Sequence, residues 1–444
     1  MRMNANRVIS RIRKLAISVL SRYERISSSA RAILRETAKE TSLSGEDTAS
    51  LNMLVLGVIK RLNTIDFIIA RVLKNRSPAS LSFTRKAALR LAIFEGRWLG
   101  VPFSTIQEEH PRTERPVMPP IRKALEFNLE ESIAGFERVG QLSIMLSHPT
   151  FMVETLLENM SDDQAIQLMK VNNSASEHYI RLNRLLVSDE EESDLLNDID
   201  AELILDEDYE GLYHVTEGID TIIESEPFES GRVLIHDKAS VAAVDALSPS
   251  ENDIIWDACA APGMKTQLIA ENLGSSGRLV ASDVYRNRVR LGIRRCKKMG
   301  CDFSEWLLAD ASYPPIRNSD KILIDAPCTS TGILQRDPSY KWRLNKQYLS
   351  AMMTVQHKIL DSVVTAFQET PGVEIVYATC SLLPHEGESQ IDSILDSHDI
   401  ELVDLDLNYS TGYDGFKCSS SVRRLFPHTD KTNAFFISKL RIPQ

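Results

Sequence analysis

Apolar residues recur at helical spacing through the first third of the chain. One face of a predicted first helix carries Val8, Ile12, Leu15, Ala16, Val19 and Leu20, and a second stripe comprises Leu51, Leu54, Val55, Val58, Ile59 and Leu62. The segment SFTRKAALRLAIFEGRWLG continues this pattern and stops at Gly100 and Pro102. HPRTERPVMPP, residues 110–120, contains four prolines and predicts a loop, with one further helix at roughly 121–139. Residues 1–145 therefore predict an all-helical domain.

An acidic stretch, SDEEESDLLNDIDAELILDEDYE, follows at residues 188–210. Its composition is typical of a disordered tail. However, Ser188 and Glu191 have the spacing of a capping box, and Leu195, Leu196, Ile199 and Leu203 share a helical face. We therefore expect a short solvated helix within a small α+β connector module, residues 146–230.

From about residue 231 the pattern changes to alternating strands and helices. Apolar runs that predict strands are DIIWDACA, GRLVASDV, SEWLLAD, KILIDAP and VEIVYATCS. The intervening helical segments include MKTQLIAENLG, YRNRVRLGIRRCKKMG and YLSAMMTVQHKILDSVVTAF. Repeated β-α-β units predict a doubly wound, Rossmann-like parallel sheet over residues 231–444, with ligands at the carboxyl ends of the strands.

Composition and charge narrow the class of protein. The 444 residues are 43% hydrophobic and 25% charged, as in soluble globular proteins, and no apolar run approaches the ~18 residues of a membrane span. Residues 1–150 carry 24 Lys and Arg against 14 Asp and Glu, whereas the remainder carries 27 against 48. The basic residues 1–150, followed by an acidic remainder, suggest that this first part contacts a polyanion, although solvated helix faces explain its charge equally well.

Cysteine usage bears on metals and compartment. The chain has six cysteines and no CxxC pair, so we expect no metal site and a reducing, cytoplasmic environment. The Arg- and Ser-rich start also resembles a transit peptide, but its apolar helical face favours a domain helix. We expect a monomer that does not bind membranes.

Three aspartates end successive predicted strands. Asp257 opens the small-residue loop DACAAPGMKT, which lets a ligand approach the backbone closely but lacks the G-x-G-x-x-G dinucleotide spacing. Asp283, 26 residues on, suits the two hydroxyls of a ribose, and Asp310 could accept a hydrogen bond from an adenine amine. Singly, each is a common turn or capping residue. Together they describe a pocket for S-adenosylmethionine.

Two cysteines lie at predicted strand ends on the same edge: Cys328 in DAPCTSTG and Cys380 in YATCS. Carbon 5 of a pyrimidine is a poor nucleophile, and its methylation needs a thiolate that adds at carbon 6 and an acid that bonds the ring. An amine-directed methyltransferase is disfavoured, because Cys328 stands where such enzymes place a base-stacking aromatic residue. The spacing alone leaves open which thiol attacks, and structural packing of either thiol stays an alternative.

The motifs DACAAPGMKT, DAPCTSTG and YATCS, with Glu386 and Glu388, closely resemble the RsmB-type (Sun/Fmu) RNA cytosine-5 methyltransferase family. The resemblance extends to GRVLIHDKAS, RDPSYKWR, the connector with its Arg-x-Asn in RLNRLL, and the final strand KTNAFFISKLR. The helical front is similar to the NusB-like RNA-binding domain of the RsmB subgroup. Most of the chain is covered.

The resemblance implies a role for each matched residue. The cofactor's methionine end would be wrapped by Cys259, Ala260, Ala261, Pro262, Gly263, Met264 and Lys265. Asp283 would hold the ribose, Asp310 the adenine side, and Asp325 would lie near the cofactor and bond the target cytosine. Cys380 would be the attacking thiol, and Cys328 would assist resolution of the covalent intermediate. This order is not general, since in DNA cytosine-5 methyltransferases the Pro-Cys thiol attacks.

The chain departs from the family pattern at three places. Met264 replaces a glycine, Thr329-Ser330 replaces Ser-Gly, and Asn433-Ala434 replaces Asp-Gly. None of these changes removes a reactive group. The implied substrate is cytosine in RNA, with ribosomal RNA favoured over transfer RNA because of the NusB-like front. A non-catalytic RNA-binding assembly factor is an alternative that the intact cysteines disfavour.

Overall fold

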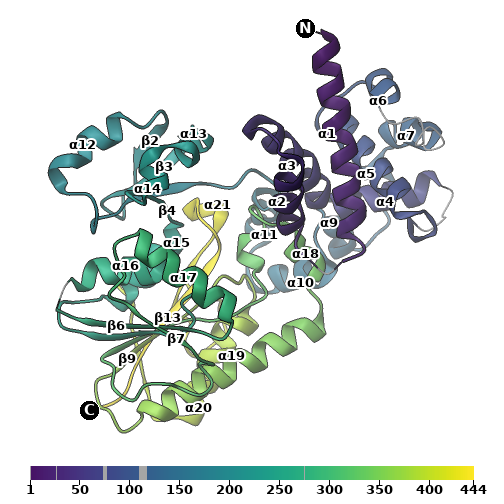
Figure 1. Ribbon diagram of the computed structural model, residues 1–444. Helices are drawn as coiled ribbons and strands as arrows, with labels where there is room; N and C mark the ends of the chain where they lie inside the picture. The colour runs from purple at the N-terminus through teal and green to yellow at the C-terminus, as the bar shows by residue number, and fades with distance from the viewer. Residues whose placement is uncertain (1, 27, 74–77, 110–117, 275) are drawn as a thin grey trace. The chain divides into compact units, whose positions relative to one another are not determined.

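The computed structural model describes residues 2–26, 28–73, 78–109, 118–274 and 276–444 (Figure 1). The chain divides into two compact units. Unit 1 comprises residues 1–174 and 334–344, and unit 2 comprises residues 175–333 and 345–444. Most of the expected connector, from residue 175 on, lies in unit 2 together with the methyltransferase part. The division into three domains stays a prediction. Among the described residues, no helix is long and apolar enough to cross a membrane.

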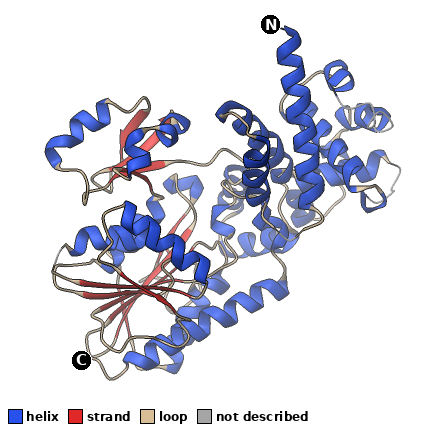
Figure 2. Ribbon diagram, in the orientation of Figure 1, coloured by secondary structure: helices blue, strands red, loops and turns tan. Residues whose placement is uncertain are grey.

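Unit 1 is helical throughout its described part, as expected from its hydrophobic pattern (Figure 2). Its helices are α1 (Arg2–Tyr23), α2 (Ala30–Thr41), α3 (Gly45–Lys60), α4 (Leu62–Val72), α5 (Phe83–Trp98), α6 (Phe103–Glu109), α7 (Met118–Leu125), α8 (Leu129–Ile133), α9 (Arg138–Met145), α10 (Thr150–Asn159), α11 (Asp162–Val171), α18 (Ser339–Arg343) and the 3-10 turn η1 (Pro78–Ser80). The stripe that predicted α3 forms its core, since Leu51, Val55, Val58 and Ile59 are fully buried.

The prediction of a single helix at 121–139 is wrong. The chain forms three helices there, α7, α8 and α9. Asn128 interrupts the run because its side chain caps α8 by accepting a hydrogen bond from the backbone N–H of Glu131. The predicted proline-rich loop is also too long, because Pro119 and Pro120 lie in the first turn of α7, where a missing N–H costs nothing. Its remaining residues, 110–117, lie outside the described residues.

Residues 334–344 lie within the methyltransferase part of the sequence but belong to unit 1 in the structure. Lys341 is completely buried, and its ammonium group donates to the carbonyl oxygen of Ser147 at 3.1 Å and to Oδ1 of Asn173 at 2.5 Å. Burial lowers the pKa of Lys341 well below its usual value. The chain thus anchors in the helical unit directly after the Pro-Cys loop.

Unit 2 begins with a small antiparallel sheet in the order β2-β3-β1-β4. Its strands are β1 (Tyr179–Leu182), β2 (Glu202–Leu205), β3 (Leu212–Glu217) and β4 (Val233–Ile235), accompanied by α12 (Asp189–Asn197), α13 (Ile219–Glu224) and α14 (Glu226–Ser230). The capping box predicted at Ser188 and Glu191 is present at the start of α12. The acidic stretch therefore begins with the predicted short helix. The helix ends at Asn197, however, and Leu203, which was expected on its apolar face, lies in strand β2.

The larger sheet confirms the predicted Rossmann-like class. Its order is β11-β12-β13-β9-β8-β5-β6-β7, with β10 paired to β13. The parallel strands are β5 (Ile254–Asp257), β6 (Arg278–Asp283), β7 (Glu305–Leu308), β8 (Lys321–Asp325) and β9 (Glu374–Thr379). The antiparallel extension comprises β10 (Glu401–Val403), β11 (Ser410–Thr411), β12 (Arg423–Leu425) and β13 (Phe435–Arg441). The sheet is therefore mixed, with its parallel half where the alternating pattern predicted it.

Helices cover both faces of this sheet. One apolar cluster joins one face to α15 (Lys238–Leu247), α16 (Met264–Leu273) and α17 (Arg286–Lys298). A second joins the other face to α19 (Lys346–Phe367) and α20 (Glu388–Ser397). Successive residues of β5 show the alternation, since Ile255 belongs to the first cluster and Trp256 to the second. Short 3-10 turns η3 (Thr331–Ile333) and η4 (Pro384–Glu386) and the helix α21 (Pro427–Asp430) complete the unit.

Candidate active site

The register of the parallel strands brings the predicted site residues to one edge of the sheet. Asp257 at the end of β5 pairs with Ala281 of β6 and Leu323 of β8, so Asp283 and Asp325 end their strands two residues further on. Asp325 in turn pairs with Ala378 of β9, two residues before Cys380. Residues from four strands therefore meet at the carboxyl edge, where open α/β sheets bind their ligands.

The loop after β5 has the shape of a ligand cradle. Gly263 has a φ of +98°, a conformation that favours glycine, and it leads directly into α16. The backbone N–H of Ala260 donates to the carbonyl oxygen of Ser282, which ties the loop to β6. Of the predicted cofactor residues, Ala260, Ala261 and Gly263 are buried, Cys259, Met264 and Lys265 are half-buried, and Pro262 is exposed. The loop thus presents backbone and small side chains at the start of a helix.

Asp257 is the buried carboxyl group beneath this loop. Its Oδ2 accepts a 2.7 Å hydrogen bond from the Thr266 hydroxyl, whereas its Oδ1 is buried without a hydrogen-bond partner. Burial, followed by the charge of Asp325, raises the pKa of Asp257 to about 7. An unsatisfied buried carboxyl oxygen needs a donor or a positive charge. Both the ammonium and the sulfonium of S-adenosylmethionine meet that need, so the residues present fit this cofactor.

Asp283 and Asp310 each organise the turn after their strand. Asp283 is 4% exposed, and its carboxylate accepts from the backbone N–H of Tyr285 at 3.0 Å and lies 3.3 Å from the Arg288 guanidinium. Asp310 accepts from the backbone N–H of Ser312 at 2.9 Å and is exposed. The turn role and the ligand role are compatible, and the ribose and adenine assignments stay predictions.

Lys265 links the cofactor loop to the Pro-Cys loop. Its ammonium group lies 2.8 Å from Oδ2 of Asp325 and sits over the ring of Phe435, 5.2 Å from the centroid. Burial lowers the pKa of Lys265, but Asp325 and then Cys380 raise it, and the net shift is upward. Lys265 therefore carries its positive charge beside the Asp325 carboxylate.

The two predicted thiols are neighbours. Sγ of Cys328 lies 3.1 Å from Sγ of Cys380, although 52 residues separate them, and both side chains are half-buried. The pKa of Cys328 is raised well above its usual value by the hydrogen bond with Cys380, by burial and by the charges of Cys380 and Glu386. A thiol with a strongly raised pKa keeps its proton.

The family departures have visible consequences in the Pro-Cys loop. Ser330 stands where the family has a glycine, and its φ is +58°, in the left-handed region that glycine adopts without strain. Met264, at another of the three departures, is half-buried and packs against the apolar cluster of α15 and α16. The loop therefore keeps a conformation typical of glycine although a serine occupies it.

Two residues at the site were not given a role by the sequence. Glu386 is fully buried, and its carboxylate accepts a hydrogen bond from the side chain of Gln356 at 2.9 Å. Gln356 also donates to the carbonyl oxygen of Pro327 at 2.8 Å. The sequence did contain a signal for Gln356, because it is a polar residue among the buried apolar residues of α19, such as Leu349, Leu360 and Val363.

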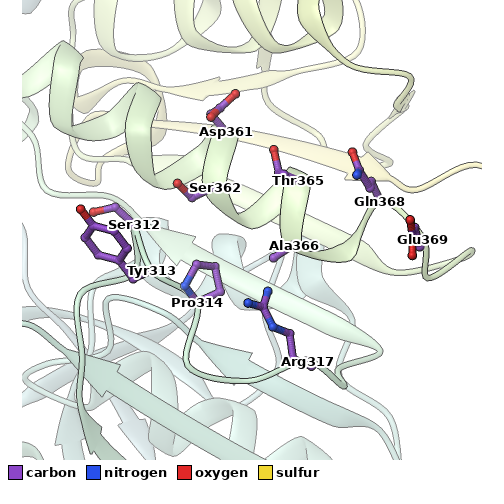
Figure 3. A pocket seen from close by; sticks show the side chains of 10 residues that line it. All are labelled: Ser312, Tyr313, Pro314, Arg317, Asp361, Ser362, Thr365, Ala366, Gln368 and Glu369. Carbon is purple, nitrogen blue, oxygen red and sulfur yellow. The ribbon is translucent and has the colours of Figure 1, made fainter.

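A separate pocket of 570 Å³ lies between α19 and the loop after Asp310 (Figure 3). Tyr313 and Arg317 line it from the loop, Asp361 lines it from α19, and Glu369 lines it from the turn that follows the helix. None of the predicted cofactor or catalytic residues is among its lining. The predicted catalytic residues therefore lie at the strand ends and not in this pocket.

Comparisons with known proteins agree with this geometry. Residues 244–441 match the family described as 16S rRNA methyltransferase RsmB/F, and residues 10–109 match the NusB family. A probable ribosomal RNA small subunit methyltransferase B from Bacillus subtilis (strain 168) is 23% identical over 97% of this chain and 98% of its own length. A 28S rRNA (cytosine-C(5))-methyltransferase from Mus musculus is 30% identical over 48% of this chain and 28% of its own.

A solved structure of similar fold spans both units. The crystal structure of PH0851 has a TM-score of 0.76 and 25% identity, and the match covers 97% of this chain and 98% of that one. The matched methyltransferases depend on S-adenosylmethionine, the cofactor that the loop and Asp257 fit. Residues 244–441 therefore form a methyltransferase domain of the RsmB/F family of ribosomal RNA methyltransferases, and residues 10–109 form a region of the NusB family.

Proposed function

We propose that the protein methylates carbon 5 of a cytosine in ribosomal RNA through a covalent cysteine–cytosine intermediate. The observation that carries this proposal is the thiol pair, Cys328 and Cys380, 3.1 Å apart at the ends of neighbouring strands. The similar mouse protein, named as a cytosine-C(5) methyltransferase, supports the choice of atom. S-adenosylmethionine supplies an electrophilic methyl group to carbon 5.

Cys380 is the nucleophile in this proposal. Its sulfur adds to carbon 6 of the cytosine, and the electron pair of the 5,6 double bond then becomes available at carbon 5. The raised pKa of Cys328 supports this order, since Cys328 holds a proton while its neighbour reacts. After methylation, carbon 5 loses its proton to a water molecule, and the electron pair of that bond re-forms the 5,6 double bond. The bond between carbon 6 and sulfur then breaks with its electrons on sulfur, and Cys328 protonates the departing Cys380 thiolate.

Asp325 and Lys265 orient the base in the same mechanism. Asp325 bonds the edge of the cytosine ring, and the 2.8 Å contact with Lys265 fixes where its carboxylate lies. The charge of Cys380 is also among the causes that raise the pKa of Lys265, so the Lys265 ammonium attracts Cys380 when Cys380 is a thiolate. One lysine thereby serves both the thiolate and the base-binding carboxylate.

RNA contact on unit 2 is assigned to α17. This helix carries Arg286, Arg288, Arg290, Arg294, Arg295, Lys297 and Lys298, all exposed, and no acidic residue. Residues 151–444 contain only 27 Lys and Arg against 48 Asp and Glu, so one helix of 13 residues holds about a quarter of their positive charge. Phosphate binding is mainly electrostatic, and α17 is a concentrated source of positive charge in an acidic unit.

Two single variants test the chemistry. Purified protein is incubated with S-adenosylmethionine and ribosomal RNA from cells that lack the modification. Cys380→Ala should abolish methyl incorporation and any denaturant-resistant protein–RNA adduct. Cys328→Ala should accumulate that adduct, because the resolving proton is missing.

The outcomes separate the proposal from its alternatives. An adduct formed by the Cys380→Ala protein would overturn the assignment of the nucleophile. Binding of the RNA by the wild-type protein without methylation, with transfer RNA tested in parallel, would leave an assembly factor as the function. Methylation of transfer RNA alone would exclude the ribosomal substrate.

A further inference from the structure

The Glu386 carboxylate connects the two loops that carry the thiols. Its Oε1 accepts from the backbone N–H of Thr329 at 2.8 Å, and its Oε2 accepts from the Thr329 hydroxyl at 2.5 Å. The same Oε2 accepts from the Ser381 hydroxyl at 2.5 Å. Thr329 directly follows Cys328 and Ser381 directly follows Cys380. A single side chain thus holds the residue after each reactive cysteine.

The bonding of Glu386 is complete and specific to a carboxylate. Four groups donate hydrogen bonds to its two oxygens: the backbone N–H and the hydroxyl of Thr329, the hydroxyl of Ser381 and the side-chain amide of Gln356. A carboxylate suits this set because it only accepts. The side chain is fully buried, and its own carbonyl oxygen accepts from the Tyr377 hydroxyl at 3.0 Å. Water does not compete for these bonds, so they define a fixed geometry.

We propose that Glu386 is a positioning residue that sets the separation of the Cys328 and Cys380 sulfurs during catalysis. This inference rests on the proposed function and deepens it. The two thiols must trade a proton while Cys380 forms and breaks its bond to the base. Such a transfer needs hydrogen-bond distance between the sulfurs, and Glu386 maintains it by holding Thr329 and Ser381 on one carboxylate.

A second tie between the loops shows what Glu386 adds. The backbone N–H of Gly332 donates to the carbonyl oxygen of Cys380 at 2.9 Å, and the Thr331 hydroxyl lies 3.1 Å from that of Ser381. These contacts keep the loops adjacent without Glu386. Among the described residues, the Glu386 carboxylate is the group that hydrogen-bonds Thr329, the residue after Cys328, so its loss should loosen the sulfur pair while the fold persists.

The test compares single-turnover methylation by Glu386→Gln, Glu386→Ala and a matched control, Glu374→Gln. Glu374 is the first residue of β9, the strand that leads to Cys380, and it pairs with Lys439 and Arg441. The control therefore removes a carboxylate at the end of this strand that is remote from the thiols. The rate constant reports the geometry of the site, whereas the amplitude reports the fraction of folded enzyme. RNA binding is measured separately.

Glu386→Ala should lower the rate constant on the order of 100-fold, as small displacements of reacting groups do, with RNA affinity within about twofold of wild type. Glu386→Gln should retain more activity, because its amide oxygen still accepts from Thr329 and its NH₂ group can donate to one hydroxyl. Adding Thr329→Ala to Glu386→Ala should cost no more than Glu386→Ala alone, since both act through one interaction. The control should keep the wild-type rate constant.

Two results would overturn the inference. One is a reduced amplitude with an unchanged rate constant in Glu386→Ala, which makes the residue merely structural. The other is an equal loss of rate in the Glu374→Gln control. Failure of the proposed function has a different signature, because the wild-type protein itself would then form no 5-methylcytosine.

Discussion

Replacing Asp257 with asparagine should make the stability of unit 2 less sensitive to pH. The Asp257 side chain is fully buried, and its pKa rises from 3.8 to about 7, chiefly through burial. A carboxyl group with a raised pKa in the folded state binds its proton more tightly there than in the unfolded chain. The folded state therefore loses stability as pH rises between these two values, and an asparagine removes this dependence.

The magnitude follows from the same shift. A difference of about three pKa units corresponds to about 4 kcal/mol once both states are ionised. By pH 5 about 1.5 kcal/mol of this cost is already present, so about 2.5 kcal/mol accrues between pH 5 and pH 8. The asparagine oxygen can still accept from the Thr266 hydroxyl, which preserves the one hydrogen bond that Asp257 makes.

The assay is urea unfolding of both proteins at pH 5, 6, 7 and 8 without cofactor. Trp98 and Trp342 lie in unit 1, and replacing both with phenylalanine leaves Trp256 and Trp306 as reporters of unit 2. The free energy of unfolding of Asp257→Asn minus that of wild type should grow by about 2.5 kcal/mol from pH 5 to pH 8. Other titrating groups cancel in this difference. A difference constant within about 0.5 kcal/mol would refute the reasoning.

Three further outcomes follow from other parts of the chain. Arg290→Ala with Arg294→Ala on α17 should weaken RNA binding and reduce the slope of log K against log salt by about 1.5 to 2, whereas Arg278→Ala, which removes an exposed partner of Glu305, should not. A salt slope equal to that of wild type would remove α17 from the RNA contact. Lys341→Met should lower the free energy of unfolding of unit 1 by about 3 kcal/mol, and with it the urea midpoint, because two buried oxygens lose their donor. Lys346→Met, at an exposed lysine, should have little effect. Equal midpoints for these two variants would contradict the anchoring role. Ser330→Gly should stabilise unit 2 by roughly 0.5 to 1 kcal/mol, the relief of a left-handed residue less the added chain entropy of glycine, and destabilisation would show that φ is not the governing factor.

The sequence determined the architecture because hydrophobic periodicity records which faces are buried. The alternation from residue 231 gave the parallel strands and their helices, and the stripe at Leu51, Val55 and Ile59 gave a buried helical face. Periodicity failed at 121–139, where one capping residue, Asn128, divides what reads as a single helix. Local hydrogen bonds of this kind do not alter the hydrophobic pattern.

The motifs placed the predicted site residues on strand ends, but only the tertiary structure decided how they meet. Cys328 and Cys380 are 52 residues apart, and it is the pairing of β8 with β9 that brings their sulfurs to 3.1 Å. The raised pKa of Cys328 depends on its hydrogen bond with Cys380, on burial and on the charges around it, which spacing does not encode. The roles of Glu386 and Gln356 likewise arise from contacts between loops and a distant helix. The sequence by itself thus determined the chemistry available to this protein, and the packing of the sheet decided which atoms can carry it out together.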